Sequence, residues 1–195
     1  MNVSVIIANP TPTSFSHAMV HAALNVVRTK KHRVFVHDLY EEKFHPVLES
    51  AEADNYHSSD ALVERHCQEI SAADVILIFH PNWWGQPPAI LKGWVDRVLR
   101  PGVAYDYRMG DSPADAPVGL LKADCALVFN TSNTPWEREV EVFGNPLQIL
   151  WKNCVFDLCG VPTFERRVFG PMTSSTAEMR QGWLSEVAAL VGDHS

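Results

Sequence analysis

The chain has 195 residues, 46% of them hydrophobic and 20% charged, which is typical of one globular domain. Its formal net charge is −7 and its basic residues are scattered, so nucleic acid, which binds to concentrated positive charge, is excluded as a partner. No run of about 20 apolar residues occurs, so we expect no segment inserted in a membrane.

The first predicted element is a strand. Residues 3–8 are β-branched and almost continuously apolar, the pattern of a strand that is covered on both faces. The opening residues lack the basic start and small-residue cleavage site of a signal peptide, so we expect a cytoplasmic protein. A loop rich in Pro, Thr and Ser follows at 9–16, and residues 18–27 carry apolar side chains at helical spacing. Ser14 or Ser16 can cap that helix.

The same alternation continues to the end of the chain. Further strands are predicted at 33–38, 74–80, 124–130 and 163–169, and further helices at about 60–71, 90–99, 146–158 and 176–191. A polar stretch follows the second strand at 40–59, and its acidic part 49–54 is interpreted most simply as a solvated loop. Strands that alternate with helices predict an α/β domain over residues 1–195, with a doubly wound five-stranded parallel sheet and helices on both faces.

Three loops of this sheet are predicted to meet at one edge, because ligands of open α/β sheets bind outside the carboxyl ends of the strands. The first loop has no glycine-rich motif, but its hydroxyls and the following helix N-terminus suit a phosphate. In the loop 81–88, Trp83 and Trp84 beside Gly85 can form a wall for a flat ligand. The loop 130–136 is polar and ends in an aromatic residue. Together the loops favour a flat polar ring with a phosphate tail, such as flavin mononucleotide. A polar turn and tryptophans in core packing are the alternatives.

Several other residues are open to a structural or a functional interpretation. His80 ends a strand and can simply cap or pack, while Tyr105 and Tyr107 alternate as on an extended segment and can line a pocket or an interface. The four cysteines form no CxxC pair and the nine histidines are dispersed, so we predict buried cysteines and no metal site. The tryptophans on predicted helices are expected in the core, and these are Trp94, Trp151 and Trp183. For Trp94, a dimer contact is the alternative.

One segment of the sequence is a highly specific indicator of family membership. Residues 81–98 resemble the signature of the flavodoxin-like NAD(P)H:quinone oxidoreductase family, in which a proline and an aromatic pair precede Pro-Ala-Ile-Leu-Lys-Gly-Trp. That family holds the DT-diaphorases, bacterial NAD(P)H-dependent oxidoreductases and ancillary proteins of potassium-efflux systems. Residues 13–16 are similar to its phosphate loop, and 102–105 to the segment after its third helix. The resemblance covers most of the chain and implies a flavodoxin-like fold.

The resemblance also implies a cofactor and the residues that hold it. It implies non-covalent FAD or FMN, NAD(P)H as the reductant, and a homodimer with the active site at the interface. With FAD, the alternative role for the acidic stretch 49–54 is a place at the adenine end of the cofactor. The positions that would cradle the phosphates are Asn9, Thr13, Ser14 and Phe15. Those that would line the isoalloxazine are Pro81, Asn82, Trp83, Trp84 and Gly85. Those that would bind its polar edge are Thr131, Ser132 and Asn133. Substrate-pocket candidates are Trp84, Tyr105 and Tyr107; no catalytic acid or base is assigned, since the chemistry takes place at the flavin N5.

The implied activity is hydride transfer from NAD(P)H through the bound flavin to a quinone or a similar small electron acceptor. The alternative is a redox-linked ancillary subunit of a potassium-efflux system, with a membrane protein as its partner and weak oxidoreductase activity. A flavodoxin-type electron carrier and a cofactor-free protein are two further hypotheses. The chain departs from DT-diaphorase after the fourth strand, where it lacks the Tyr and His thought to relay charge to the flavin. Phe143 stands at the His position.

Overall fold

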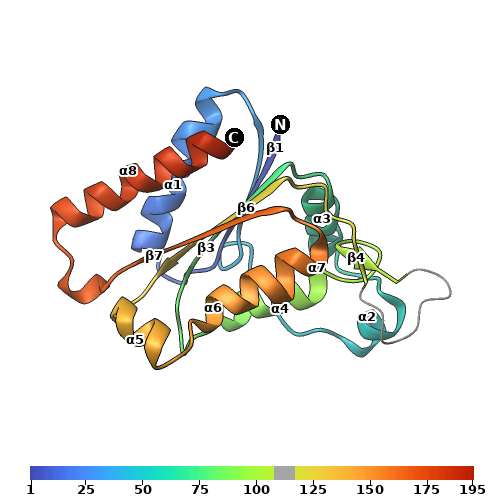
Figure 1. Ribbon diagram of the computed structural model, residues 1–195. Coiled ribbons are helices and arrows are strands. Elements are labelled where there is room, and N and C mark those ends of the chain that lie inside the picture. The colour runs from blue at the N-terminus through green and yellow to red at the C-terminus, as the bar shows by residue number, and fades with distance from the viewer. Residues whose placement is uncertain (108–116) are drawn as a thin grey trace.

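The computed structural model describes residues 1–107 and 117–195 (Figure 1). Its centre is a parallel sheet of five strands in the order β2-β1-β3-β6-β7. These strands are β1 (Asn2–Ile7), β2 (Arg33–Asp38), β3 (Val75–Pro81), β6 (Cys125–Thr131) and β7 (Thr163–Phe169). The predicted doubly wound α/β sheet is confirmed, and the order reverses between β1 and β3, where such folds bind ligands.

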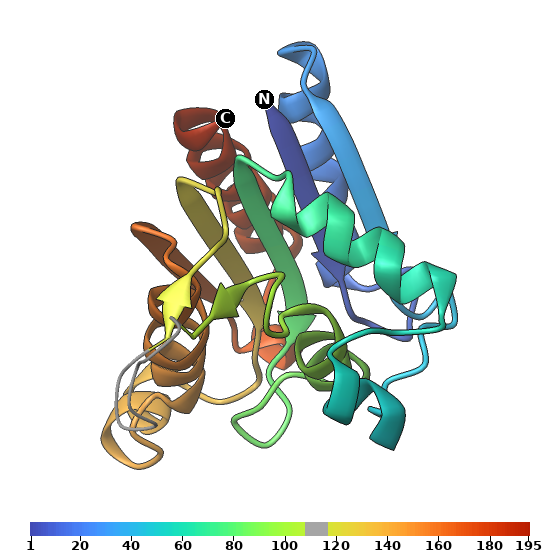
Figure 2. The same ribbon diagram turned by 90° about the vertical axis from the view of Figure 1, so that its right-hand side faces the viewer.

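Helices cover both faces of the sheet (Figures 1 and 2). On one face lie α1 (Phe15–Thr29) and α8 (Ala177–His194); on the other lie α3 (Ala61–Ser71), α4 (Ala89–Val98) and a continuous helical segment made of α6 (Pro146–Ile149), the π-helix η1 (Leu150–Phe156) and α7 (Asp157–Cys159). Successive residues of β1 enter different cores, with Val5 and Ile7 facing α1 and Ile6 facing α3 and α4. Burial on both faces explains the continuous apolar run of each central strand.

Side-chain caps set the start of three helices. Ser14, not Ser16, caps α1 and accepts the backbone N–H of His17 at 3.4 Å. Asp60 caps α3, and Thr176 caps α8. Each cap satisfies an N–H group that has no carbonyl partner in a preceding turn.

The prediction of a solvated loop at 49–54 was wrong. Residues Ser50–Asn55 form the short helix α2, and the Glu52 carboxylate is buried against Arg97, whose Nε donates to it at 2.8 Å. Glu52 is one of three acidic residues in this stretch, and nothing near it in the sequence reveals a buried partner 45 residues away. The other elements not predicted are β4 (Tyr105–Asp106), β5 (Val118–Gly119), α5 (Trp136–Glu141) and the 3₁₀ turn η2 (Met172–Ser174). Each is too short to show a period of its own.

The core residues agree with the sequence in most cases. Trp94 and Trp151 are fully buried, and Trp183 packs against the rings of Phe15 and Phe169. Three cysteines are buried as predicted, but Cys154 is exposed, because it lies on the outer face of η1. Within the described part of the chain, every helix is too short or too polar to cross a bilayer.

Candidate functional site at the carboxyl edge of the sheet

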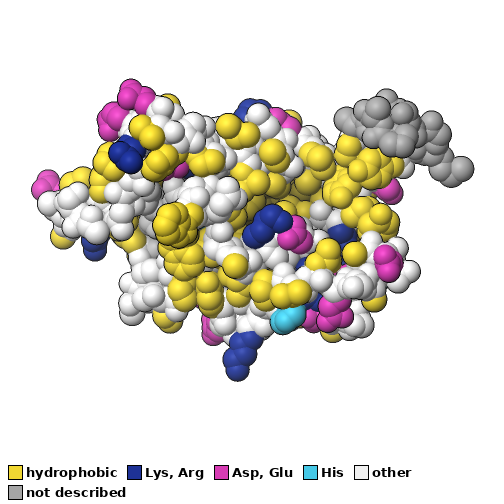
Figure 3. Space-filling view, turned by 90° about the horizontal axis from the view of Figure 1, so that it is seen from below, with side chains coloured by type: hydrophobic (Ala, Val, Ile, Leu, Met, Phe, Trp, Pro, Cys, Tyr) yellow, Lys and Arg dark blue, Asp and Glu magenta, His cyan; other side chains and the backbone are white. Residues whose placement is uncertain are grey.

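The three loops named by the sequence meet at the carboxyl ends of β1, β3 and β6, at the bottom of Figure 2. Backbone hydrogen bonds fasten their first residues together, from Ala8 N to Phe79 O at 3.0 Å and from Asn82 N to Thr131 O at 2.7 Å. Figure 3, the view from below, looks onto this edge, across which hydrophobic side chains gather. The parallel sheet therefore brings together segments more than a hundred residues apart.

The loop between β1 and α1 is shaped by its own side chains. Asn9 accepts the backbone N–H of Thr11 at 3.0 Å and donates from Nδ2 to Oγ of the buried Ser16 at 3.2 Å. Asn9 thus holds the loop instead of presenting both its polar atoms to solvent. The N–H groups of Phe15 and Ser16, at the start of α1, have no carbonyl in a preceding turn and are suited to an anion.

The loop after β3 is a tight hairpin that turns outward at Trp84. The backbones of Trp83 and Gln86 exchange hydrogen bonds of 3.0 and 2.9 Å, and the two residues between them have positive φ, 57° at Trp84 and 71° at Gly85. Two consecutive left-handed residues define a type I′ turn. A tryptophan in this conformation is strained, and Trp84 is fully exposed, with a relative accessibility of 101% for the whole residue. Trp83 is also exposed, whereas Pro81 is buried.

Beside Trp84 lies a cleft of about 540 Å³. It is lined by Asn82, Trp84, Gly85, Thr134, Glu139, Phe143 and Pro146. A Cβ at Gly85 would stand 2.8 Å from Cγ of Pro146, so the close approach of the hairpin to α6 needs glycine. Asn82 donates from Nδ2 to the buried Glu139 carboxylate at 3.0 Å, which joins the hairpin to α5. The sequence signalled the β3 side of the cleft and missed the α5 side, because α5 itself was not predicted.

The polar side chains of the loop after β6 bind backbone groups within this loop and the next one. Oγ of Ser132 accepts the N–H of Thr134 at 3.0 Å, and Oδ1 of Asn133 accepts the N–H of Thr173 at 3.0 Å. Thr131 and Ser132 are buried, and Thr134, which was not singled out, is the member of this loop that lines the cleft. The predicted binders Thr131, Ser132 and Asn133 therefore hold the edge of the sheet, and their contact with a ligand stays a prediction.

Tyr105 and Tyr107 lie together, as their spacing predicted, with ring centroids 6.1 Å apart in an edge-to-face arrangement. Both line a cavity of about 230 Å³ with residues of η1 and α7, including Cys154. Neither lines the cleft beside Trp84. One copy of the chain therefore does not bring the three substrate-pocket candidates into one cavity.

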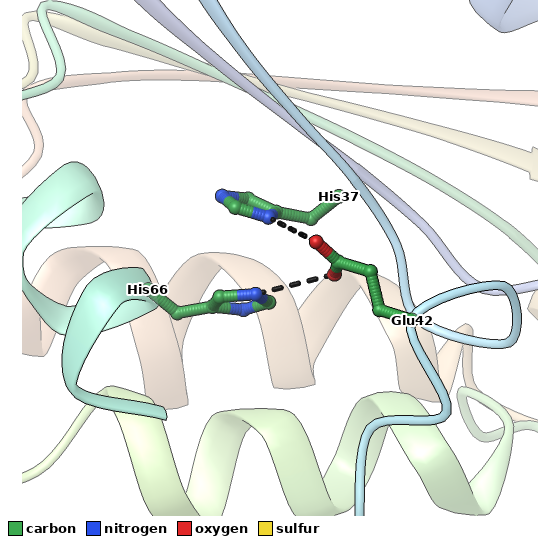
Figure 4. A group of neighbouring side chains, drawn as sticks. All are labelled: His37, Glu42 and His66. Atoms are coloured by element: carbon green, nitrogen blue, oxygen red, sulfur yellow. Dashed lines mark hydrogen bonds and ion pairs between the residues drawn. The ribbon is translucent and has the colours of Figure 1, made fainter. Parts of the chain in front are cut away.

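A second polar cluster lies between the carboxyl end of β2 and α3 (Figure 4). The Glu42 carboxylate lies 3.1 Å from Nδ1 of His37 and 3.2 Å from Nε2 of His66. Trp94 donates to Nδ1 of His66 at 2.9 Å, so a neutral His66 carries its proton on the nitrogen that faces Glu42. The rings of His37 and His66 stack with centroids 3.7 Å apart. Glu42 thus already occupies the point toward which both rings are directed, as in an ion-pair network.

Comparisons with known proteins agree with this geometry. The sequence matches the family described as flavodoxin-like fold over residues 1–190. It is 34% identical to an uncharacterized NAD(P)H oxidoreductase of Haemophilus influenzae over 87% of this chain and 84% of that one. It is 32% identical to NAD(P)H dehydrogenase [quinone] 1 of Rattus norvegicus over 92% of this chain and 73% of the relative. The structure superposes with a TM-score of 0.75 on an FMN-dependent NADH-azoreductase of Bacillus anthracis in complex with FMN, at 15% identity and 98% coverage of both chains. The chain therefore belongs to the flavodoxin-like NAD(P)H:quinone oxidoreductase family.

Proposed function

We propose that this chain is a flavin-dependent NAD(P)H oxidoreductase that passes a hydride to a quinone or a similar small acceptor. The observation that carries the proposal is the exposed, strained Trp84 beside a cleft at the carboxyl edge of the sheet, between the segments that follow β3 and β6. Strain of this kind persists where surrounding structure enforces it and is concentrated at functional sites. The names of the relatives from Haemophilus influenzae and Rattus norvegicus support the reaction class.

The residues at the edge of the sheet fit a flavin. The cleft of about 540 Å³ is large enough for a tricyclic ring and has an indole on one side. The ring would lie against Asn82, Trp84 and Gly85, and the phosphate would lie at the loop of Thr13 and Ser14, near the first N–H groups of α1. When bound, the flavin supplies hydride acceptance at N5 and electron transfer to the second substrate.

The chain itself contributes position and shielding. The Trp84 indole can stack on a flat donor or acceptor and exclude water from one side of it. The Glu139 carboxylate is fixed by Asn82 at 3.0 Å and gives the inner wall of the cleft a negative charge. No side chain of this edge needs to act as an acid or a base, since the cofactor handles its own protons.

We further propose a homodimer in which Tyr105 and Tyr107 of one copy complete the substrate pocket of the other. The separation of these rings from the Trp84 cleft within one chain supports an incomplete site. The apolar side chains exposed around the cleft, among them Trp136, Val140, Val142 and Phe143, support a covered surface. Light scattering of the purified protein tests the dimer, and a monomer under all conditions would contradict it.

The experiment that tests the proposed function is a cofactor analysis of the purified full chain. Heat-released material is identified by mass spectrometry, and the emptied protein is titrated with FMN, FAD and riboflavin. Recovery or tight binding of one flavin nucleotide is expected, and this also decides between FMN and FAD. Folded protein that binds neither nucleotide would contradict the proposal. A flavin-loaded protein that oxidises NAD(P)H only very slowly would favour the ancillary role in potassium efflux.

A further inference from the structure

Three side chains at the proposed phosphate loop form a continuous hydrogen-bonded chain. Oγ of Ser14 lies 2.9 Å from Nδ1 of His17, and Nε2 of His17 lies 2.9 Å from Oδ2 of Asp38. Ser14 caps α1, His17 lies in its first turn and Asp38 ends β2. The His17 and Asp38 side chains are only 14% and 18% exposed. The chain therefore links the loop to the neighbouring strand through a partly buried imidazole.

The Asp38 end of this chain fixes one proton of His17. The other carboxylate oxygen of Asp38 accepts the backbone N–H groups of Tyr40 and Glu41 at 3.1 and 3.2 Å, which holds the carboxylate in place. An ionised carboxylate only accepts hydrogen bonds, so Nε2 of His17 carries a proton whether the ring is neutral or charged. A proton added to the neutral ring of His17 therefore goes to Nδ1, the nitrogen that faces Ser14.

The proton on Nδ1 of His17 determines whether the Ser14 hydroxyl can donate a hydrogen bond to a ligand. When His17 is neutral, Nδ1 is an acceptor and the hydroxyl hydrogen of Ser14 points toward the imidazole. When His17 is charged, Nδ1–H donates to Oγ and the hydroxyl hydrogen is free to donate elsewhere. Only in the second state can Ser14 donate a hydrogen bond to an anion in the loop.

We infer that His17 is a positioning residue for the flavin phosphate and takes up a proton when the phosphate binds. This inference rests on the proposed function. The loop 9–16 contains no Lys or Arg, so a charged His17 would supply the positive charge beside the phosphate dianion. Uptake of the proton releases the Ser14 hydroxyl to the phosphate at the same time.

Other ionisable groups lie near this chain on the two elements that form it. Asp38 is in direct contact with His17. His21 lies one turn further along α1, and Tyr40 and Glu41 follow β2. Of these groups, Asp38 stabilises the charged ring through its hydrogen bond, and His21 provides a matched histidine outside the hydrogen-bonded chain.

The test is calorimetric titration of the emptied full-length protein with FMN in buffers of different ionisation enthalpy, from about pH 7 to 9, where the phosphate itself is fully ionised. The expected result is a net uptake approaching one proton per FMN, with a Kd that rises up to about tenfold per pH unit. Riboflavin, which lacks the phosphate, should bind without proton uptake. His17→Gln should abolish the uptake and weaken FMN more than riboflavin, whereas His21→Gln should keep the uptake.

A second variant guards against misfolding of the first. In Asp38→Asn, the side-chain amide can donate to Nε2, which lets neutral His17 carry its proton on Nδ1, so the uptake should fall although the imidazole remains. FMN binding with no proton uptake across the range, or equal uptake in His17→Gln, would overturn the inference and leave the proposed function intact. Failure of the protein to bind any flavin nucleotide would overturn both.

Discussion

Trp151 donates a hydrogen bond from its indole Nε1 to Nε2 of His80 at 3.0 Å, deep between η1 and β3. The same nitrogen lies 2.8 Å from Nδ2 of Asn130, so it faces two N–H donors and carries no proton. Nδ1 of His80 therefore holds the proton and donates it to the Pro81 carbonyl at 2.8 Å. These contacts fix the end of β3, directly before the Trp84 hairpin. Hydrogen bonding and burial thus give His80 a structural role.

The protonation of His80 makes stability depend on pH. Burial lowers the pKa of His80 to about 3, whereas an unfolded histidine titrates at about 6.5. Below about pH 6.5, His80 binds a proton in the unfolded state but stays neutral in the folded state. The free energy of unfolding should therefore fall as pH drops, by up to about 1.4 kcal/mol per pH unit. Urea unfolding at pH 7 and pH 5 measures it.

His80→Phe removes this titration. We expect the variant to be less stable at pH 7 by roughly 1–3 kcal/mol, because the Trp151 and Asn130 donors lose their acceptor. Its loss of stability between pH 7 and pH 5 should be smaller than that of the unsubstituted protein. An unchanged difference between the two pH values would contradict the assignment.

The substitution Trp84→Asn should change protein stability and flavin binding in opposite directions. Asn-Gly is the preferred pair for a type I′ turn, and the Trp84 side chain makes no buried contact to lose. Relief of the strained conformation should raise the free energy of unfolding by about 1 kcal/mol. Loss of the indole should weaken flavin retention, measured as the Kd for FMN and FAD. Unchanged affinity for both nucleotides would remove Trp84 from the flavin site.

Alanine substitution at two helical glycines should change the free energy of unfolding in opposite directions. A Cβ at Gly93 in α4 would lie 2.1 Å from the Pro46 carbonyl oxygen, whereas a Cβ at Gly182 in α8 meets no atom of the described chain within 4 Å. Gly93→Ala should lower the free energy of unfolding by about 1–3 kcal/mol. Gly182→Ala should raise it by up to about 1 kcal/mol through helix propensity. Thermal unfolding of the pair checks both, and equal responses would contradict the packing of α4 against Pro46.

The ion-pair network of Glu42 with His37 and His66 should stabilise the folded protein in weak acid. Burial alone would raise the pKa of Glu42, but the hydrogen bonds from His37 and His66 outweigh it and lower the pKa to about 2. The contribution is therefore complete above the unfolded pKa of about 4.3 and is lost as pH falls toward 2. Glu42→Gln should lose stability at pH 6, by roughly 2–3 kcal/mol, and have a flatter acid profile. The exposed neighbour substitution Glu41→Gln should behave like the unsubstituted protein, and a shared profile for both variants would count against the network.

The sequence predicted the parts of the fold that carry their own periodicity. The five strands of the main sheet and the helices α1, α3, α4 and α8 lie within a few residues of their expected positions, because apolar patterning and caps such as Ser14 and Thr176 are local signals. Helices α2 and α5 were missed, because each has six residues and depends on tertiary contacts. Glu52 is held by Arg97 and Glu139 by Asn82, from distant segments of the chain.

The candidate site shows the same division. The adjacent tryptophans in a loop indicated a special role for the segment after β3. The structure agrees, because the type I′ turn holds Trp84 outward in solvent. The role of Ser132 in binding Thr134 could not be predicted, because a polar loop residue can serve the backbone or a ligand equally well. The role of His17 in α1 could not be predicted, because its partner Asp38 lies in β2, 21 residues further along the chain.

The most direct test of the central claim is an absorbance titration of the purified, flavin-loaded protein with NAD(P)H under argon. We expect the oxidised flavin band to bleach on addition of NADH or NADPH and to return when a quinone is added. A folded protein whose visible spectrum shows no flavin after reconstitution with FMN or FAD, or whose flavin band is unchanged by both reductants, would contradict it.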